Sequence, residues 1–156
     1  MTIAAILGID PTAQSTTPEF VPGSLGAVTD SNGTKIYKYL KYDDGTAAVD
    51  GVAGEVAYYY TLDGYKNHVC SSDLSDSIEI GAGVIQANIA TETYGWFQIK
   101  GAATLSIALT AGADGDPLTP TGSADGTLDV SSAATDNVCA IAGDISDKEI
   151  ICDFPM

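Results

Sequence analysis

Few side chains in this sequence have the chemistry of a catalytic site, and the single histidine is the first to consider. His68 stands two residues before Cys70 in the polar stretch 66–70. In a strand both side chains would point to the same side, so the two could form a Cys–His pair. No neighbouring residue supplies the orienting group or the oxyanion donors that a nucleophile requires. We therefore predict a polar loop here, and we do not expect the chain to be an enzyme.

An acidic turn at residues 113–116 is the second candidate for chemistry. Its carboxylates, Asp114 and Asp116, resemble part of a calcium-binding loop. Such a loop needs further oxygen ligands and a closing Glu at fixed spacing, whereas here Pro117 follows directly. We favour a solvated turn and keep a weak divalent-ion site at Asp114 and Asp116 as the alternative. The sequence also lacks a complete glycine-rich phosphate loop, so we expect no metal and no cofactor.

The three cysteines predict packing rather than a disulfide framework. Cys70, Cys139 and Cys152 are odd in number and form no C-x-x-C pair. Cys139 and Cys152 lie in apolar, strand-like runs, where a cysteine usually behaves as a small buried side chain. We therefore predict buried free thiols, which suits assembly in a reducing cytoplasm.

The charge of the chain restricts its partners. It carries 21 acidic residues against 6 basic ones, a net charge of −15, and every basic residue is a lysine. A field this negative repels phosphate backbones and anionic lipid, and arginine is the usual residue for reading phosphates and bases. We expect neither nucleic acid nor membrane as a partner. Residues 1–9 are apolar, but they are too few to span a bilayer and have no basic start, so no export is expected.

Short β-branched and aromatic runs, separated by turn residues, predict an all-β fold. Turns are expected at residues 30–33, where Asn-Gly accepts positive φ, and at residues 43–45. No stretch has a sustained helical period. We predict a single compact barrel or sandwich of short antiparallel strands, with a long loop at residues 111–126. The predicted strands are residues 35–42, 56–61, 77–80, 84–89, 94–100, 104–110, 127–130, 137–142 and 148–154.

The clearest of these strands is residues 94–100, and its alternation predicts which side chains face inward. Phe97 and Ile99 are expected in the core, with Gln98 and Lys100 outward. Trp96 then points away from Phe97, so it either covers the other face of the sheet or meets a partner. The run at residues 104–110 repeats the pattern and is expected to bury its two leucines and Ile107.

Residues 1–24 differ from the rest of the chain. Three prolines interrupt any regular element, and the start carries an apolar tip at Ile3, Ile6 and Leu7. We predict an extended N-terminal arm at residues 1–24 and a β-domain at residues 25–156. Two placements of the arm stay open: it docks on a neighbouring protein, or it folds onto its own core as a short helix or edge strand.

A run near the middle of the chain carries a resemblance to a known family. Residues 94–104, YGWFQIKGAAT, resemble a signature of the head decoration proteins, or capsid cement proteins, of tailed bacteriophages. A strand like residues 83–87 precedes that signature in the family, and a G-x-L-D run like residues 126–129 follows it. The likeness extends over residues 30–156 and does not include the arm.

The resemblance implies a structural role. Such a protein is a β-rich protomer that forms a homotrimer and binds the outside of a phage capsid, where it bridges subunits of the major capsid protein. The alternative is a tail- or fibre-associated module that recognises a host glycan through surface aromatics. Protein-interface candidates under these interpretations are Ile3, Ile6, Leu7, Tyr94, Trp96, Gln98 and Phe154.

Overall fold

The protein is nearly all-β, with 42% of its residues in strands and 5% in helices, which confirms the predicted fold class. The computed structural model describes residues 6–61 and 63–156. In chain order the elements are β1 (Ile6–Leu7), β2 (Gln14–Ser15), β3 (Leu25–Asp30), β4 (Gly33–Tyr42), β5 (Val56–Tyr60), α1 (Gly64–Asn67), β6 (Val69–Ser71), the 3-10 turn η1 (Leu74–Asp76), β7 (Ser77–Ile85), β8 (Thr93–Thr104), β9 (Pro117–Thr119), β10 (Asp129–Val130), β11 (Ala140–Ala142) and β12 (Glu149–Asp153).

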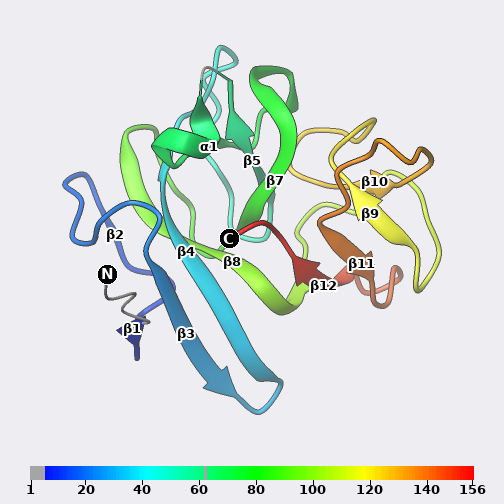
Figure 1. The fold of residues 1–156 in the computed structure, drawn as a ribbon, viewed down its shortest axis with the longest axis horizontal. Coiled ribbons are helices and arrows are strands. Elements are labelled where there is room, and N and C mark those ends of the chain that lie inside the picture. The colour runs from blue at the N-terminus through cyan, green and yellow to red at the C-terminus, as the bar shows by residue number, and fades with distance from the viewer. Residues whose placement is uncertain (1–5, 62) are drawn as a thin grey trace.

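Five strands close into a barrel at the centre of the molecule (Figure 1). β4 pairs with β8, β8 with β7, β7 with β5, β5 with β6, and β6 returns to β4. All of these pairings are antiparallel except β4–β6, which is parallel. Closure removes the free sheet edges that an open sheet of this size would expose.

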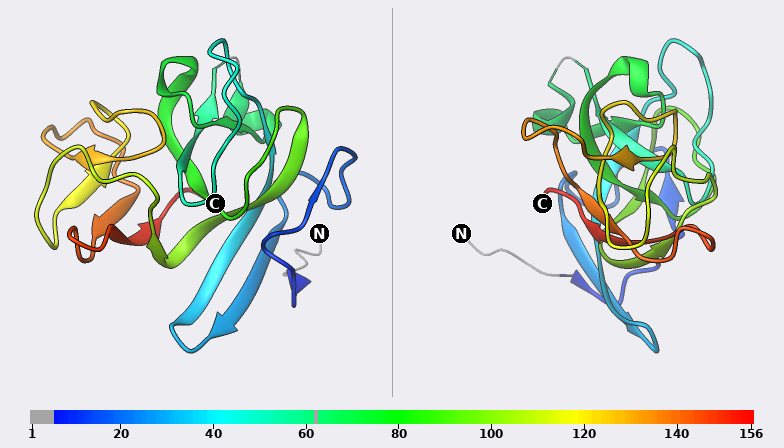
Figure 2. Two further views of the ribbon diagram at one scale, coloured as in Figure 1. Left: turned by 180° about the vertical axis from the view of Figure 1, so that it is seen from behind. Right: turned by 90° about the vertical axis from the view of Figure 1, so that its right-hand side faces the viewer.

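A C-terminal lobe extends the barrel sheet on one side. β8 is 12 residues long, and its second half pairs with β12; the order then continues through β11, β9 and β10. Seen from behind in Figure 2, this lobe stands beside the barrel while the β3–β4 hairpin projects below it. The predicted turn forms the tip of that hairpin, where Asp30 accepts a hydrogen bond from the Asn32 amide.

Three apolar clusters fill the fold, and together they bury both faces of β4 and β8. The first draws on all five barrel strands and includes Leu40 and Phe97. The second joins the barrel to the C-terminal lobe and includes Leu118 and Phe154. The third covers the outer face of β4 and β8 and contains Tyr37, Tyr39 and Trp96. A strand buried on both faces loses the apolar–polar alternation of a half-exposed strand.

The structure corrects three of the predicted strands. Residues 106–110 form a loop after β8, where Ile107 is exposed and only Leu105 of the expected apolar set is buried. Residues 77–80 and the start of 84–89 belong to one continuous strand, β7. Gly83 continues that strand with a φ of 143°, at a point where an added Cβ would lie 2.9 Å from the Gln98 carbonyl oxygen. The glycines therefore do not end the strand, and they let β7 approach β8 closely.

The N-terminal segment lies on its own domain over the residues that the structure describes. β1 pairs in parallel with β3, and β2 pairs with the start of β8 (Figure 1, blue). Ile9 packs against the third cluster, and the Gln14 side-chain amide donates to the Asn88 carbonyl at 2.7 Å. Of the two placements left open, residues 8–24 take the one on the domain's own sheet, so they do not form a free stalk.

Candidate interaction surface

Trp96 and Tyr94, two of the predicted interface residues, belong to an aromatic cluster on the outer face of the barrel. Trp96 is 3% exposed, and its ring lies 5.0 Å from Tyr39 and 5.1 Å from Phe20. Tyr94 is partly buried and stacks on Tyr39 at 6.0 Å. Of the two predicted places for Trp96, the other face of the sheet is correct. Its cover comes from Phe20 of the N-terminal segment, which no local pattern around Trp96 could have indicated.

Gln98 and Phe154, two further protein-interface candidates, are both buried. The Gln98 side-chain amide donates to the backbone carbonyls of Lys100 and Ala102, so it supplies hydrogen-bond donors to two carbonyl groups of its own strand, β8. The outward prediction for Gln98 was therefore wrong, because its polar end finds partners within its own strand. Phe154 lies in the core between the barrel and the C-terminal lobe and is fully buried. Its position near the end of the chain gave no sign of that role.

The apolar tip of the predicted arm is only partly described. Ile3 lies outside the described residues. The backbone of Ile6 and Leu7 forms β1, and pairs with Gly26 and Ala27 of β3. The structure therefore ties the end of this segment to its own hairpin.

The structure places His68 at the end of α1 and Cys70 in the apolar cluster inside the barrel. Cys70 is fully buried beside the Lys41 carbonyl, and burial raises the pKa of its thiol well above the usual range. His68 follows α1 in the left-handed conformation, and a Cβ added at Gly23 would meet its ring at 2.5 Å. Its Nδ1 is buried with no hydrogen-bond partner among the described residues. Burial, with a smaller effect of the Lys38 charge, lowers the pKa of this imidazole.

Lys38 is a buried charged residue that the sequence patterns did not single out. It is 3% exposed, and its Nζ donates to the Tyr59 hydroxyl at 2.8 Å. The same Nζ lies 4.9 Å from the centre of the Tyr65 ring, within the range of a cation–π contact. Burial lowers the pKa of its ammonium group. The two tyrosines thus replace part of the hydration that Lys38 loses on burial. Lys38 therefore packs inside the domain as part of its structure.

The two carboxylates of the acidic turn at residues 113–116 accept hydrogen bonds from backbone amides of nearby loops. Asp114 accepts from the Ile145 amide at 3.0 Å, and Asp116 accepts from the Ala113 amide at 2.8 Å. Within residues 6–61 and 63–156, no group of three or more His, Cys, Asp or Glu residues is placed to hold a metal ion. Over the same residues, no helix has the length and apolar character needed to cross a membrane.

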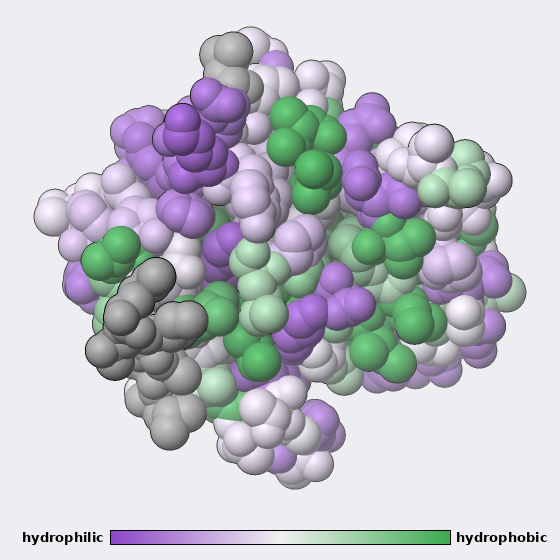
Figure 3. Space-filling model, in the orientation of Figure 1, coloured by the Kyte–Doolittle hydropathy of each residue, from purple (hydrophilic) through white to green (hydrophobic). Residues whose placement is uncertain are grey.

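The feature that the structure adds is an exposed apolar row across the C-terminal lobe. Ile141 of β11 lies opposite Ile151 of β12, and the two are 44% and 51% exposed. Pro117 of β9 flanks Ile141 on one side, and Ala102 of β8 flanks Ile151 on the other; both are exposed. We call these four residues the apolar row. Figure 3 shows green, hydrophobic side chains gathered over this part of the molecule.

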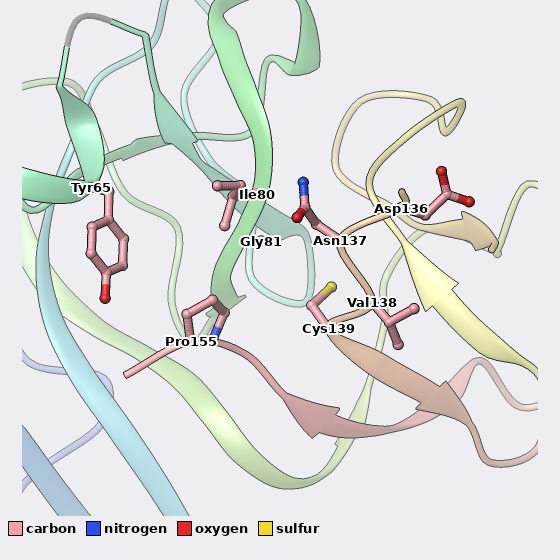
Figure 4. A pocket seen from close by; sticks show the side chains of 8 residues that line it. All are labelled: Tyr65, Ile80, Gly81, Asp136, Asn137, Val138, Cys139 and Pro155. Carbon is pink, nitrogen blue, oxygen red and sulfur yellow. The ribbon is translucent and has the colours of Figure 1, made fainter. Parts of the chain in front are cut away.

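A groove of about 460 Å³ opens beside the apolar row (Figure 4). Tyr65 lies on one side, Val138 on the other, and β7 runs between them. Val138 is 50% exposed and stands just before β11, so the groove adjoins the strand that carries Ile141. The complete lining is Tyr65, Ile80, Gly81, Asp136, Asn137, Val138, Cys139 and Pro155.

The apolar row and the groove form a surface suited to binding another protein. The exposed isoleucines on adjacent strands, with Val138 just before one of those strands, are costly in water, and covering them with a partner is favourable. Sequence reasoning missed this surface, although the alternation in β12 (Glu149–Asp153) contains the signal: Ile150 and Cys152 face inward, which leaves Ile151 outward between two acids.

Comparisons with known proteins give no relative to guide the assignment. The chain matches no protein-family model, no curated protein and no solved structure. What the surface does must therefore be argued from its own chemistry.

Proposed function

We propose that this protein is a structural component of a phage virion that binds the outside of the capsid and stabilises it by bridging subunits of the major capsid protein. The observation that carries the proposal is that Ile141 and Ile151, two of the exposed large apolar side chains, lie directly opposite each other on paired strands beside the groove. The resemblance of residues 94–104 to head decoration proteins supplies the identity of the partner.

The properties of the domain support a scaffold role. A closed barrel extended by a second lobe places the apolar row on paired strands, which hold an interface more precisely than loops do. The net charge of −15 keeps such a protein soluble before it attaches.

Recognition of a glycan through Trp96 loses its support. A sugar-binding platform needs an exposed aromatic face, whereas Trp96 and Tyr39 are buried and Tyr94 is partly covered. Tyr65 is exposed, but its hydroxyl donates to the Met156 carbonyl and its ring faces Lys38.

We also infer a homotrimer, from the resemblance together with a strand pair whose outward faces were expected to carry Gln86, Asn88, Gln98 and Trp96. Gln98 and Trp96 are buried and cannot form the contact, whereas Gln86 is partly buried and Asn88 is exposed. Light scattering of the protein in solution should give three times the monomer mass of 16.0 kDa. If the trimer assembles only on the shell, imaging of virions should instead show threefold density.

Sedimentation tests the proposed function. Purified protein is mixed with undecorated capsids and centrifuged, and the pelleted protein is measured against a sample without capsids. We expect saturable co-sedimentation and a higher temperature of capsid disruption, because a ligand that binds only the assembled shell stabilises it. If the protein stays in the supernatant at every concentration, the proposed function is refuted.

A further inference from the structure

The charges around the apolar row specify the kind of partner that it fits. Glu149 and Asp153 stand two residues on either side of Ile151, so all three point outward from β12. Both acids are exposed, and Asp153 forms an ion pair with Lys100. The apolar centre therefore has an acidic border on its own strand.

A third carboxylate is fixed at the groove. Asp136 lines it and accepts hydrogen bonds from the amides of Ser132 and Ala133 at 2.8 and 2.9 Å. These amides lower the pKa of Asp136 below its ordinary value. The groove thus offers an apolar lining with a stable negative charge at its border.

This border disfavours a second copy of the chain as the occupant. Three of the six lysines already pair with acidic residues of their own chain, and Lys38 is buried. Another copy would bring mainly carboxylates against Glu149, Asp153 and Asp136, and like charges brought together in an interface are repulsive. The three paired lysines are Lys35, Lys41 and Lys100.

We propose that the apolar row and the groove bind a protein segment in which a large apolar side chain is flanked by lysine or arginine. The apolar side chain enters the groove beside Val138, and the basic residues meet Asp136 of the groove lining and Asp153, whose backbone amide donates to the Cys139 carbonyl beside the groove. The groove, at about 460 Å³, has room for such a side chain. The inference rests on the proposed function in one respect: on the virion, the segment belongs to the shell protein.

The first test uses capsids and two matched variants. Ile151→Lys places a positive charge at a half-exposed position of the apolar row, where it removes an apolar contact and repels a basic partner, and Val49→Lys makes the same change at a position 55% exposed away from it. Melting curves establish that both variants fold. We expect Ile151→Lys to weaken co-sedimentation roughly tenfold, equivalent to about 1.4 kcal/mol, and Val49→Lys to leave it unchanged. Equal binding by Ile151→Lys and the wild type would overturn the inference.

The second test needs no capsid. Three peptides are titrated into protein labelled at isoleucine and valine methyl groups: leucine between lysines, serine between the same lysines, and leucine between glutamates. We expect the leucine–lysine peptide to shift the methyl signals of Ile141, Ile151 and Val138 while Val49 stays in place. Equal shifts with either other peptide, or shifts spread over the whole surface, would refute the proposed chemistry. Concentration-dependent shifts of the same methyls without peptide would instead assign the surface to a second copy and also refute it.

The two tests separate the inference from the proposed function. If the wild type fails to sediment with capsids but the leucine–lysine peptide maps to the apolar row, the capsid function is wrong and the partner chemistry stands. If capsids bind Ile151→Lys as well as the wild type, the capsid function stands and the surface has been assigned wrongly.

Discussion

Phe20→Ala tests whether the N-terminal segment is part of the folded domain. The Phe20 ring lies 5.3 Å from Tyr39 and 5.1 Å from Trp96, and it covers the outer face of the barrel at that point. Its removal deletes two aromatic contacts of about 0.5–1.5 kcal/mol each, together with the burial of a partly exposed ring. We therefore expect the free energy of unfolding to fall by about 2–3 kcal/mol. With a urea slope near ~2 kcal/mol per molar, the unfolding midpoint should fall by about 1 M.

Trp96 provides a local signal for the same experiment, because it is the single tryptophan of the chain. Loss of the Phe20 ring should admit water to the indole and move its emission to longer wavelength in the native protein. Val21→Ala is the matched control, since Val21 is the next residue and is 78% exposed. An unchanged emission maximum and midpoint in Phe20→Ala would show that the segment does not pack on the barrel, which would refute the placement of residues 8–24.

Three further perturbations probe the interior. Tyr58→Phe should lower the free energy of unfolding by about 1–3 kcal/mol in urea titrations, because it leaves the buried Thr127 amide without its hydroxyl partner, while the Thr127 carbonyl keeps the Ser123 hydroxyl; an effect as small as that of Tyr65→Phe would contradict this. His68→Asn, which tolerates the left-handed backbone, should lose less stability than the wild type between about pH 7.5 and 5.5 in thermal melts. The sign follows from the lowered pKa of His68: the unfolded chain takes up the proton first, so acid destabilises the wild type, and parallel curves would disprove it. The three cysteines should react with a thiol reagent only after unfolding, because all are buried and burial raises the pKa of Cys152 to about 12; rapid labelling of native protein would count against this.

The sequence predicts the fold class because strand signals are local. β-branched and aromatic runs with turn residues between them locate β4, β5 and β8, and the inward positions of Phe97 and Ile99 follow from alternation. Buried free thiols at Cys139 and Cys152 were also predicted correctly, since a cysteine in an apolar run has little reason to be exposed.

The interaction surface could not be predicted in the same way, because it depends on contacts between distant segments. Trp96 is covered by Phe20, 76 positions earlier in the chain, and an exposed Trp96 would have looked identical in the local sequence. The apolar row depends on the register of Ile141 with Ile151, which is set when four strands pair. The alternation of apolar and polar residues along a strand shows that its two faces differ, but it does not show which face a second layer will cover.

A cryo-EM map of virions that carry this protein is the most direct measurement of the central claim. We predict density for the barrel and its C-terminal lobe on the outer surface of the shell, with Ile141, Ile151 and Val138 in contact with a capsid subunit. A shell without density for this chain, or with the chain bound while the apolar row faces solvent, would contradict the account.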